Sequence, residues 1–318
     1  MSILSKIKTA WEWRKADVEK NRLEAFRLVN GQGDECPGLV VDYYVGAFHI
    51  IYKDVFWPAQ SKELTRALRE ISRLIDATRE ILFFEVENLP ASEKLPSLNP
   101  HRKEILTMAI REAECRFEVQ LSEALHTGLF LDQRESRRNI FFNAQGRRVL
   151  NLFSYTGAFS VVALKGGASE VTSVDLSKNY LNWLHRNVAL NGFALERAPV
   201  WARDVFDYLK LARKKSEKFD LIILDPPTFS RSGKTSFATD RNFDFLVKEA
   251  AGLLSSKGNL FTSVNTLKMN RDEFQGKVMK GLEGSPFKIL KPLSVPRDFK
   301  LTSAEEKNPH LKAFWIGP

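Results

Sequence analysis

The chain has 318 residues, 43% hydrophobic and 27% charged, a composition typical of a globular protein with two domains or one large domain and an appendage. Its formal charge of +9 permits a nucleic-acid partner without establishing one. No apolar run approaches the ~20 residues of a membrane span, and the first residues lack the apolar region of a secretory signal.

Cys36 and Cys115 are the only cysteines of the chain. They lie far apart and outside any spacing typical of metal ligands, so the sequence predicts no metal site. Sparse cysteine and the lack of a secretory segment together predict a cytoplasmic protein.

Residues 1–105 are predicted to form a small α+β module. The expected elements are helices at 1–20 and 59–74 and strands at 23–30, 39–44, 47–52 and 81–86. The short Val45-Gly46 connection predicts a hairpin of the two middle strands. Three prolines within 90–101 mark a boundary. No catalytic constellation occurs in this module, which we therefore interpret as a packing or substrate-orienting domain.

Residues 106–145 are predicted to connect this module to a sheet domain and to cover the ligand site there. The segment 126–138 concentrates His, Gln and three Arg residues beside a glycine, which is unusual for a plain connector. Asp132 is the expected N-cap of a helix that runs to Phe142. Composition alone leaves open whether the basic residues only form a solvated helix face.

Residues 146–318 open with a βαβ unit that is typical of a nucleotide-binding sheet. An apolar strand at 149–153 reaches a tight turn at 155–157, and a second apolar strand at 171–174 ends on Asp175. The backbone N–H groups of such a turn face a ligand, and an acid at the tip of the second strand can bind ribose hydroxyls. Any α/β protein has βα turns with a glycine, so the later strands must support this interpretation.

Strands and helices then alternate to residue 318. The remaining strands are expected at 198–201, 219–224, 258–264, 287–290 and 311–316, and the helices at 158–165, 176–190, 205–215, 240–254 and 271–282. Continuous apolar strands indicate a parallel sheet covered on both faces, and a last strand that returns without a helix adds antiparallel. The predicted fold is α/β, with a Rossmann-like seven-stranded sheet and a small N-terminal α+β domain.

Three acids fall at the carboxyl ends of successive predicted strands: Asp175, Asp204 and Asp225. In an open α/β sheet, this edge is where ligands bind. Asp175 suits ribose hydroxyls, Asp204 suits the exocyclic amine of an adenine, and Asp225 suits the reacting end of the ligand.

The loop after Asp225 is Pro226-Pro227-Thr228-Phe229. Two prolines stiffen the loop and leave carbonyl groups without competing N–H partners. Phe229 adds a ring on which a flat base can stack. Asp-Pro-Pro alone is a common loop sequence, but after the fourth strand of such a sheet it indicates an acceptor site.

These residues resemble a class I S-adenosylmethionine-dependent methyltransferase. More narrowly, the chain resembles the bacterial 23S ribosomal RNA methyltransferases that modify the 5-position of cytosine or the N7 of guanine. The similarity covers most of the chain and rests on segments 27–34, 37–42, 127–134, 151–157 and 225–229. In the wider superfamily, glycines occupy the places of Phe153 and Tyr155, so the aromatic version is characteristic of this narrower group.

The resemblance implies S-adenosyl-L-methionine as the cofactor and RNA, above all large-subunit ribosomal RNA, as the substrate. The candidate cofactor residues are Gln133, Arg134, Phe153, Ser154, Tyr155, Gly157, Asp175, Asp204 and Asp225, with the Gln133-Arg134 segment lying over the methionine end. The candidate catalytic residues are Asp225, Pro226, Pro227 and Phe229, and the candidate substrate residues are Phe229, Arg231, Lys234 and Asn265. Further basic candidates for RNA contact are Arg134, Arg137, Arg138, the cluster 210–218 and the loop 230–241.

One position distinguishes the two acceptors. Cytosine-C5 methylation needs a thiolate that adds to the ring, and in the cytosine enzymes a cysteine lies in the segment that matches 262–266. Val264 takes that place here, while Thr228–Ser230 and Asn265 resemble the guanine-N7 relatives. We therefore expect in-line methyl transfer to a base nitrogen, guanine N7 being favoured. An exocyclic amine and cytosine C5 are the alternatives.

Two functions from other classes stay open. A nicotinamide oxidoreductase shares the βαβ unit, but Phe153 and Tyr155 stand where its glycine fingerprint is expected. A non-catalytic RNA-binding protein on the same scaffold also fits, since this chemistry requires no unique nucleophile. The intact acids at the cofactor edge argue against that second alternative.

Overall fold

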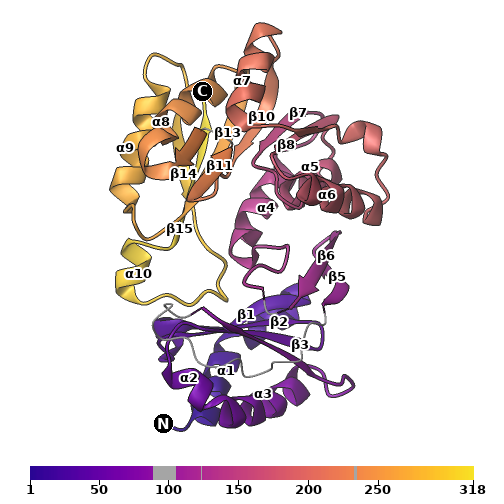
Figure 1. Cartoon of the computed structure of the whole chain (residues 1–318), viewed down its shortest axis with the longest axis vertical. Helices are drawn as coiled ribbons and strands as arrows, with labels where there is room; N and C mark the ends of the chain where they lie inside the picture. The colour runs from indigo at the N-terminus through magenta and orange to yellow at the C-terminus, as the bar shows by residue number, and fades with distance from the viewer. Residues whose placement is uncertain (89–104, 123, 233–234) are drawn as a thin grey trace. The chain divides into compact units, whose positions relative to one another are not determined.

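The computed structural model describes residues 1–88, 105–122, 124–232 and 235–318; for 87, 229–232 and 235–241 it describes the backbone alone. The chain forms two compact units (Figure 1). Unit 1 consists of Met1–Leu131 and Pro296–Ser303, and unit 2 consists of Asp132–Val295 and Ala304–Pro318. We call Pro296–Ser303 the strap, because the chain leaves unit 2 there and then returns to it. The expected connector, 106–145, is divided between the units, and the expected boundary at 90–101 lies outside the described residues.

Unit 1 is built on a four-stranded sheet with the order β1 (Ala25–Asn30), β2 (Leu39–Tyr44), β3 (Ala47–Tyr52) and β4 (Leu82–Glu87). The first three strands are antiparallel, and β4 runs parallel to β3. The predicted hairpin of β2 and β3 is confirmed. Both residues of its turn, Val45 and Gly46, have positive φ, as a two-residue hairpin turn requires.

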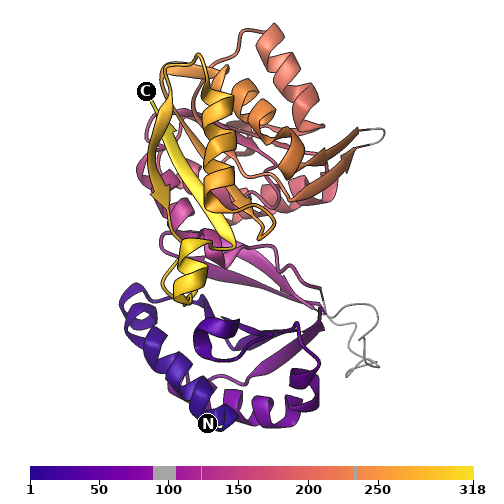
Figure 2. The same ribbon diagram turned by 90° about the vertical axis from the view of Figure 1, so that its left-hand side faces the viewer.

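Two helices, α1 (Ile3–Asn21) and α3 (Ser61–Ile75), pack on this sheet (Figure 2). Trp11 of α1 and Leu68 of α3 share one buried core with Phe26 of β1. The short helix α2 (Phe56–Ala59) precedes α3. A separate antiparallel hairpin, β5 (Leu106–Glu112) with β6 (Cys115–Leu121), also belongs to unit 1.

Unit 2 is built on a seven-stranded sheet with the order β14-β15-β13-β10-β7-β8-β9. Its strands are β7 (Arg148–Leu152), β8 (Glu170–Asp175), β9 (Val200–Ala202), β10 (Phe219–Leu224), β13 (Leu254–Asn265), β14 (Lys288–Leu293) and β15 (Leu311–Gly317). The five strands from β13 to β9 are mutually parallel, and β15 is antiparallel to both of its neighbours. The predicted mostly parallel sheet with an antiparallel last strand is confirmed.

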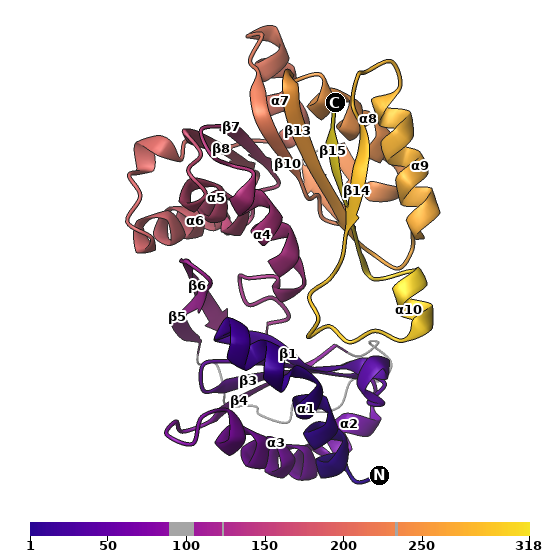
Figure 3. The ribbon, with the colours of Figure 1, turned by 180° about the vertical axis from the view of Figure 1, so that it is seen from behind.

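Helices cover this sheet: α4 (Arg134–Phe142), α5 (Ala158–Lys165), α6 (Lys178–Leu190), α7 (Val205–Lys214), α8 (Thr239–Ala251) and α9 (Arg271–Leu282). The last three bury apolar side chains in one core with Leu150, Leu152 and Leu224 of the central strands. Figure 3 shows α4, α5 and α6 grouped together, apart from α8 and α9. This doubly covered, parallel arrangement brings the carboxyl ends of β7, β8, β9, β10 and β13 to one edge of the sheet.

Two segments differ from the sequence prediction. The segment 230–241, expected as a loop, takes part in two short antiparallel strands, β11 (Phe229–Ser232) and β12 (Thr235–Ala238). Small polar residues favour a loop locally, but strand pairing satisfies the backbone N–H and C=O groups of the segment. The return to β15, expected to be non-helical, contains the short helix α10 (Ser303–Lys307). None of the described helices combines the length and apolar character needed to cross a membrane.

Candidate functional site

The turn after β7 has an unusual backbone. Phe153, Tyr155 and Gly157 all have positive φ, at 58°, 49° and 79°. A left-handed conformation costs a non-glycine residue roughly 1–2 kcal/mol, and such strained residues cluster at functional sites. Phe153 and Tyr155 are the two positions at which glycines were noted for the wider superfamily. The turn therefore keeps a glycine-type backbone while presenting two aromatic side chains at the carboxyl edge of the sheet.

Asp175, the last residue of β8, holds this turn in place. Its Oδ2 accepts a hydrogen bond from the Tyr155 backbone N–H at 2.9 Å, and its Oδ1 accepts one from the Ser177 N–H at 2.9 Å. The Tyr155 ring also packs edge-on against Tyr180 of α6, with the ring centroids 4.5 Å apart. Burial raises the pKa of the Asp175 carboxyl above its ordinary value. The acid expected at the ribose thus also positions the turn.

Gly157 permits close packing between the turn and α6. A Cβ atom added there would lie 2.3 Å from Leu184 Cγ. Behind the turn, the buried Asn187 donates a hydrogen bond from Nδ2 to the Thr156 carbonyl at 2.9 Å. Glycine is therefore required at this position both by its positive φ and by the lack of space.

Asp204 follows β9 and caps α7. Its Oδ1 accepts a hydrogen bond from the Phe206 N–H at 2.9 Å, as a helix N-cap does. This local bond fixes the orientation of Asp204, the second of the three acids, at the edge of the sheet. Its predicted contact with an adenine amine stays a prediction.

Asp225 lies at the end of β10 in a compact hydrogen-bonded group. Ser263 Oγ donates to Asp225 Oδ1 at 2.5 Å, and Gln133 Nε2 donates to the same oxygen at 3.3 Å and to Ser263 Oγ at 3.2 Å. Burial raises the pKa of Asp225 to about 6, and the charge of Asp132 adds to this, whereas the hydrogen bonds and Arg137 oppose it. A carboxyl group with this pKa changes charge close to neutral pH.

Gln133 therefore contacts Asp225 through its amide nitrogen. Its Oε1 atom and the Ser154 Oγ atom are buried and have no hydrogen-bond partner among the described residues. Unsatisfied buried polar atoms are rare in native proteins and often mark a place where a ligand or water completes the bonding. The two atoms are thus suited to bind polar groups of a ligand.

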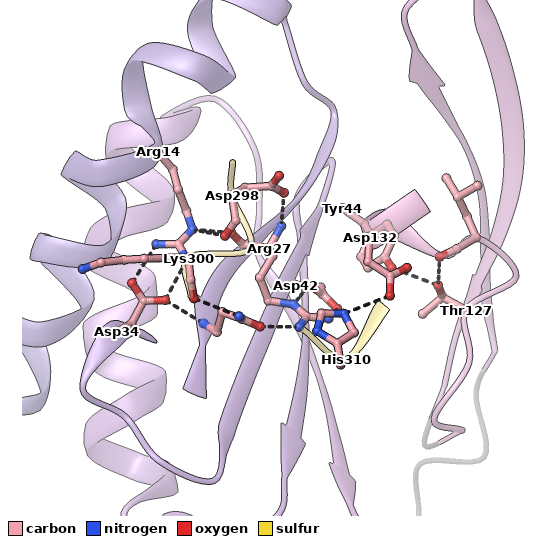
Figure 4. A network of polar contacts seen from close by, with 12 residues as sticks. Arg14, Arg27, Asp34, Asp42, Tyr44, Thr127, Asp132, Asp298, Lys300 and His310 are labelled. Carbon is pink, nitrogen blue, oxygen red and sulfur yellow. Dashed lines mark hydrogen bonds and ion pairs between the residues drawn. The ribbon is translucent and has the colours of Figure 1, made fainter. Parts of the chain in front are cut away.

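Asp132 does not cap α4, so the predicted N-cap is wrong. The N-cap position is Gln133, and it makes no side-chain capping bond. Instead, Asp132 Oδ2 accepts a hydrogen bond from Asn265 Nδ2 at 2.9 Å. The same oxygen lies 3.1 Å from His310 Nε2 (Figure 4). The carboxylate is thereby held by two segments distant in sequence, and the turn η3 (Leu131–Gln133) delays the start of the helix.

The basic residues of α4 are not equivalent. Arg134 and Arg137 are buried, with exposed fractions of 8% and 2%, whereas Arg138 is exposed. The helical period places 134 and 137 on one face and 138 on another. Arg134 and Arg137 therefore do not form an exposed basic face, and their predicted contact with RNA stays a prediction.

The loop after Asp225 is fixed at its base. Pro226 is buried and Pro227 is exposed. Thr228 Oγ1 donates a hydrogen bond to the Asn265 carbonyl at 3.0 Å, which ties this loop to the end of β13. The backbones of Phe229 and Arg231 lie in β11, but their side chains and the whole of Lys234 lie outside the described residues.

Two residues of this group, Ser263 and His310, were missed by sequence reasoning. Parallel pairing of Leu224 with Thr262 places Ser263 beside Asp225. The Thr266 N–H donates to the His310 carbonyl at 2.8 Å, which brings His310 beside the end of β13. The first was signalled by its position at the carboxyl end of a strand; the second carried no local signal.

Comparison with known proteins gives a consistent result. The family model described as S-adenosylmethionine-dependent methyltransferase matches residues 95–300. YwbD of Bacillus subtilis, a candidate ribosomal RNA large subunit methyltransferase, is 34% identical over 312 residues, which cover 97% of this chain and 78% of the relative. Ribosomal RNA large subunit methyltransferase K of Neisseria meningitidis is 35% identical over 301 residues, covering 92% and 81%. A crystal structure of a candidate methyltransferase complexed with SAH matches with a TM-score of 0.86 at 29% identity, covering 100% of this chain and 82% of the other.

Proposed function

Because this chain belongs to the S-adenosylmethionine-dependent methyltransferase family, we propose that it methylates a base nitrogen of large-subunit ribosomal RNA, with guanine N7 as the favoured acceptor. Methyl transfer and the cofactor follow from the family. The substrate class is supported by the names of the two relatives and by the basic charge of the chain. The acceptor atom is argued below from the residues around Asp225.

The residues at the sheet edge fit S-adenosylmethionine. When bound, the cofactor supplies a methyl group on a positively charged sulfur. Asp175 and the strained turn at 153–157 offer a carboxylate and backbone groups for its ribose and methionine parts. The buried Ser154 Oγ and Gln133 Oε1 atoms offer further polar contacts. Asp204, the N-cap of α7, is the residue proposed to bind the adenine amine.

The chain's own contribution to the reaction is positioning. Guanine N7 has a lone pair and carries no proton, so it needs neither a covalent adduct nor a general base. The enzyme must hold this atom in line with the methyl group, and such orientation alone accounts for a large part of a rate enhancement. A base inside a helix must first be unstacked to reach Asp225 and the loop that follows it.

The observation that carries this proposal is that unit 2, to which Asp225 belongs, contains no cysteine. Both Cys36 and Cys115 are buried in unit 1, whereas Asp225 belongs to unit 2. Burial raises the pKa of Cys36 to about 11, which keeps it a thiol at neutral pH. At the end of β13, the residue that matches the cysteine of the cytosine enzymes is the buried Val264. Addition to cytosine C6, which C5 methylation requires, has no thiolate to perform it here.

An exocyclic amine is the second candidate acceptor. Ser263 and Gln133 both bond to Oδ1 of Asp225, and no hydrogen bond to its Oδ2 occurs within the part of the chain that the structure describes. That oxygen and the Pro226 carbonyl suit the two hydrogens of an amine. This arrangement favours a nitrogen acceptor in either case.

The test is the identity of the product. The purified chain is incubated with methyl-labelled S-adenosylmethionine and with large-subunit RNA from cells that lack this protein. The RNA is then digested, and the nucleosides are identified by mass spectrometry. We expect labelled 7-methylguanosine, made equally well by the Cys36→Ser, Cys115→Ser double variant. Labelled 5-methylcytidine, or loss of turnover in that folded variant, would restore the thiolate mechanism.

A further inference from the structure

An exposed tryptophan of unit 1 is flanked by two cations. Trp13 of α1 is 42% exposed, unlike the buried Trp11. The Arg297 guanidinium lies 5.3 Å from the Trp13 ring centroid, and the Lys300 ammonium lies 5.0 Å from it. Trp13 Nε1 also donates a hydrogen bond to the Arg297 carbonyl at 3.4 Å, which fixes the ring. We call Trp13, Arg297 and Lys300 the Trp13 patch.

The strap presents these two cations by burying the residues between them. Asp298 and Phe299 are 1% and 3% exposed. Asp298 Oδ2 accepts a hydrogen bond from the Arg27 backbone N–H at 2.8 Å, and the Arg27 guanidinium lies 4.3 Å from the Phe299 ring centroid. The two middle residues of this stretch are buried. The flanking residues, Arg297 and Lys300, therefore stay beside the Trp13 ring.

A second set of contacts locks the strap backbone (Figure 4). The fully buried Arg14 donates from Nε to the Asp298 carbonyl at 2.9 Å and forms an ion pair with Asp34 at 2.6 Å. Asn30 Nδ2 donates to the Lys300 carbonyl at 3.0 Å. A Cβ atom added to Gly33 would lie 2.0 Å from that same carbonyl oxygen, so only glycine permits this approach. Segment 27–34, one of the segments that carry the family resemblance, is therefore the part of unit 1 on which the strap packs.

We propose that the Trp13 patch binds single-stranded RNA, with one base stacked on the Trp13 indole and the neighbouring phosphates contacted by Arg297 and Lys300. The patch belongs to unit 1, whereas the methyltransferase sheet belongs to unit 2. This proposal rests on the proposed function, which identifies RNA as the substrate, and adds a second RNA contact to it. Single-strand binding sites combine an aromatic side chain for stacking with cations that follow the backbone. The patch has both, on a segment whose conformation is already fixed.

Charge alone does not account for this arrangement. An acidic protein partner would need the two cations but not an exposed indole whose N–H is already engaged. The chain as a whole carries +9, so its field attracts RNA, and the exposed ring adds a surface on which a base can stack.

The test measures binding of the full chain to a fluorescein-labelled single-stranded oligo(A) by fluorescence anisotropy at several salt concentrations. Trp13→Ala removes the ring, and Trp13→Phe keeps an aromatic surface as the matched variant. Arg297→Gln and Lys300→Gln each remove one cation, and Lys291→Gln, an exposed residue of β14, controls for the loss of one charge. Melting temperature and S-adenosylmethionine affinity are measured for each variant.

We expect Trp13→Ala to weaken oligo(A) binding roughly 5- to 150-fold, and Trp13→Phe to retain most of the affinity. Arg297→Gln and Lys300→Gln should each reduce the slope of log affinity against log salt by about 0.7. Cofactor affinity should stay unchanged. A Trp13→Ala variant that binds like Lys291→Gln overturns the proposal, as does a loss matched by an equal loss of cofactor affinity.

Tighter binding of a labelled oligoglutamate than of oligo(A) by the unmodified chain would instead identify a protein-docking surface, and the RNA assignment would fail. Binding is measured without methyl transfer. The experiment can therefore contradict RNA binding by the patch without contradicting RNA methylation. Conversely, RNA methylation can be contradicted while the patch still binds oligo(A).

Discussion

Ser263 Oγ lies 2.5 Å from Asp225 Oδ1 and donates a hydrogen bond to it across two parallel strands. Gln133 bonds to both of these atoms, so three segments of unit 2 meet at one carboxyl oxygen. The carboxyl group is thereby oriented while burial raises its pKa to about 6. The orientation and charge of Asp225, the proposed acceptor-site acid, thus depend on Ser263 and Gln133.

Ser263→Ala should shift the pH dependence of methyl transfer. The Ser263 hydrogen bond lowers the pKa of Asp225, so its removal should raise that pKa above about 6. If the ionised carboxylate is the active form, the rate rises through this pKa, and the rise should move to higher pH in the variant. Ser255→Ala is the matched control, because Ser255 Oγ donates to Asp220 at 2.8 Å in the same pair of strands, β10 and β13. Superimposable profiles for the two variants would exclude the positioning role of Ser263.

Asp225→Asn should change how stability depends on pH. The pKa of Asp225 is raised by folding from 3.8 to about 6, so the folded state retains the proton more strongly. This contribution to stability is fully present below the unfolded-state pKa and is lost as pH rises through about 6, amounting to at most about 3 kcal/mol. Relative to the unmodified chain, the Asn variant should gain stability between pH 5 and pH 8 in urea unfolding. A constant difference across this range would mean that Asp225 ionises normally.

Asp175→Ala should weaken S-adenosylmethionine binding by roughly 10- to 150-fold. The variant loses a charged acceptor for the ribose, worth about 1.5–3 kcal/mol, and also frees the Tyr155 N–H that shapes the turn. Calorimetric titration measures the affinity. Asp207→Ala, an exposed acid of α7, provides the control with the same charge change. Equal affinities for both variants would remove Asp175 from the cofactor site.

Gly157→Ala should destabilise the fold by about 1–3 kcal/mol, because its Cβ meets Leu184 of α6. Gly146→Ala isolates the backbone effect, since Gly146 also has positive φ, at 70°, but has nothing within 4 Å of an added Cβ. The difference between the two variants in chemical unfolding measures the steric clash alone. Equal losses of unfolding free energy in the two variants would show that Leu184 of α6 accommodates the added methyl group without a clash.

Local pattern was sufficient to predict the sheet of unit 2. The run at 219–224 is continuously apolar because β10 is buried on both faces between β7 and β13. Once the strands are parallel, Asp175, Asp204 and Asp225 must reach one edge, and no further information is needed to place them there. The turn after β7 was also predicted. Its left-handed backbone at Phe153 and Tyr155 was not, because aromatic residues rarely adopt positive φ.

Contacts between distant segments could not be predicted in the same way. Asp132 resembled an N-cap because its true partners, Asn265 and His310, are far away in sequence. Arg137 resembled a surface residue because the burial of its helix face depends on packing against other elements. The packing of the strap on segment 27–34 could not be predicted either, because the chain leaves unit 2 between β14 and β15 and returns to it, and no sequence periodicity indicates this.

The central claim is that this chain transfers a methyl group to a base nitrogen of large-subunit ribosomal RNA without a cysteine. Its most direct test is a map of methylated nucleotides, by mass spectrometry, in ribosomal RNA from a strain that lacks the gene. The account predicts the loss of one 7-methylguanosine, restored by the unmodified chain and by the double cysteine variant but not by Asp225→Ala. An unchanged map, or the loss of a 5-methylcytidine in place of a modified guanine, would contradict it.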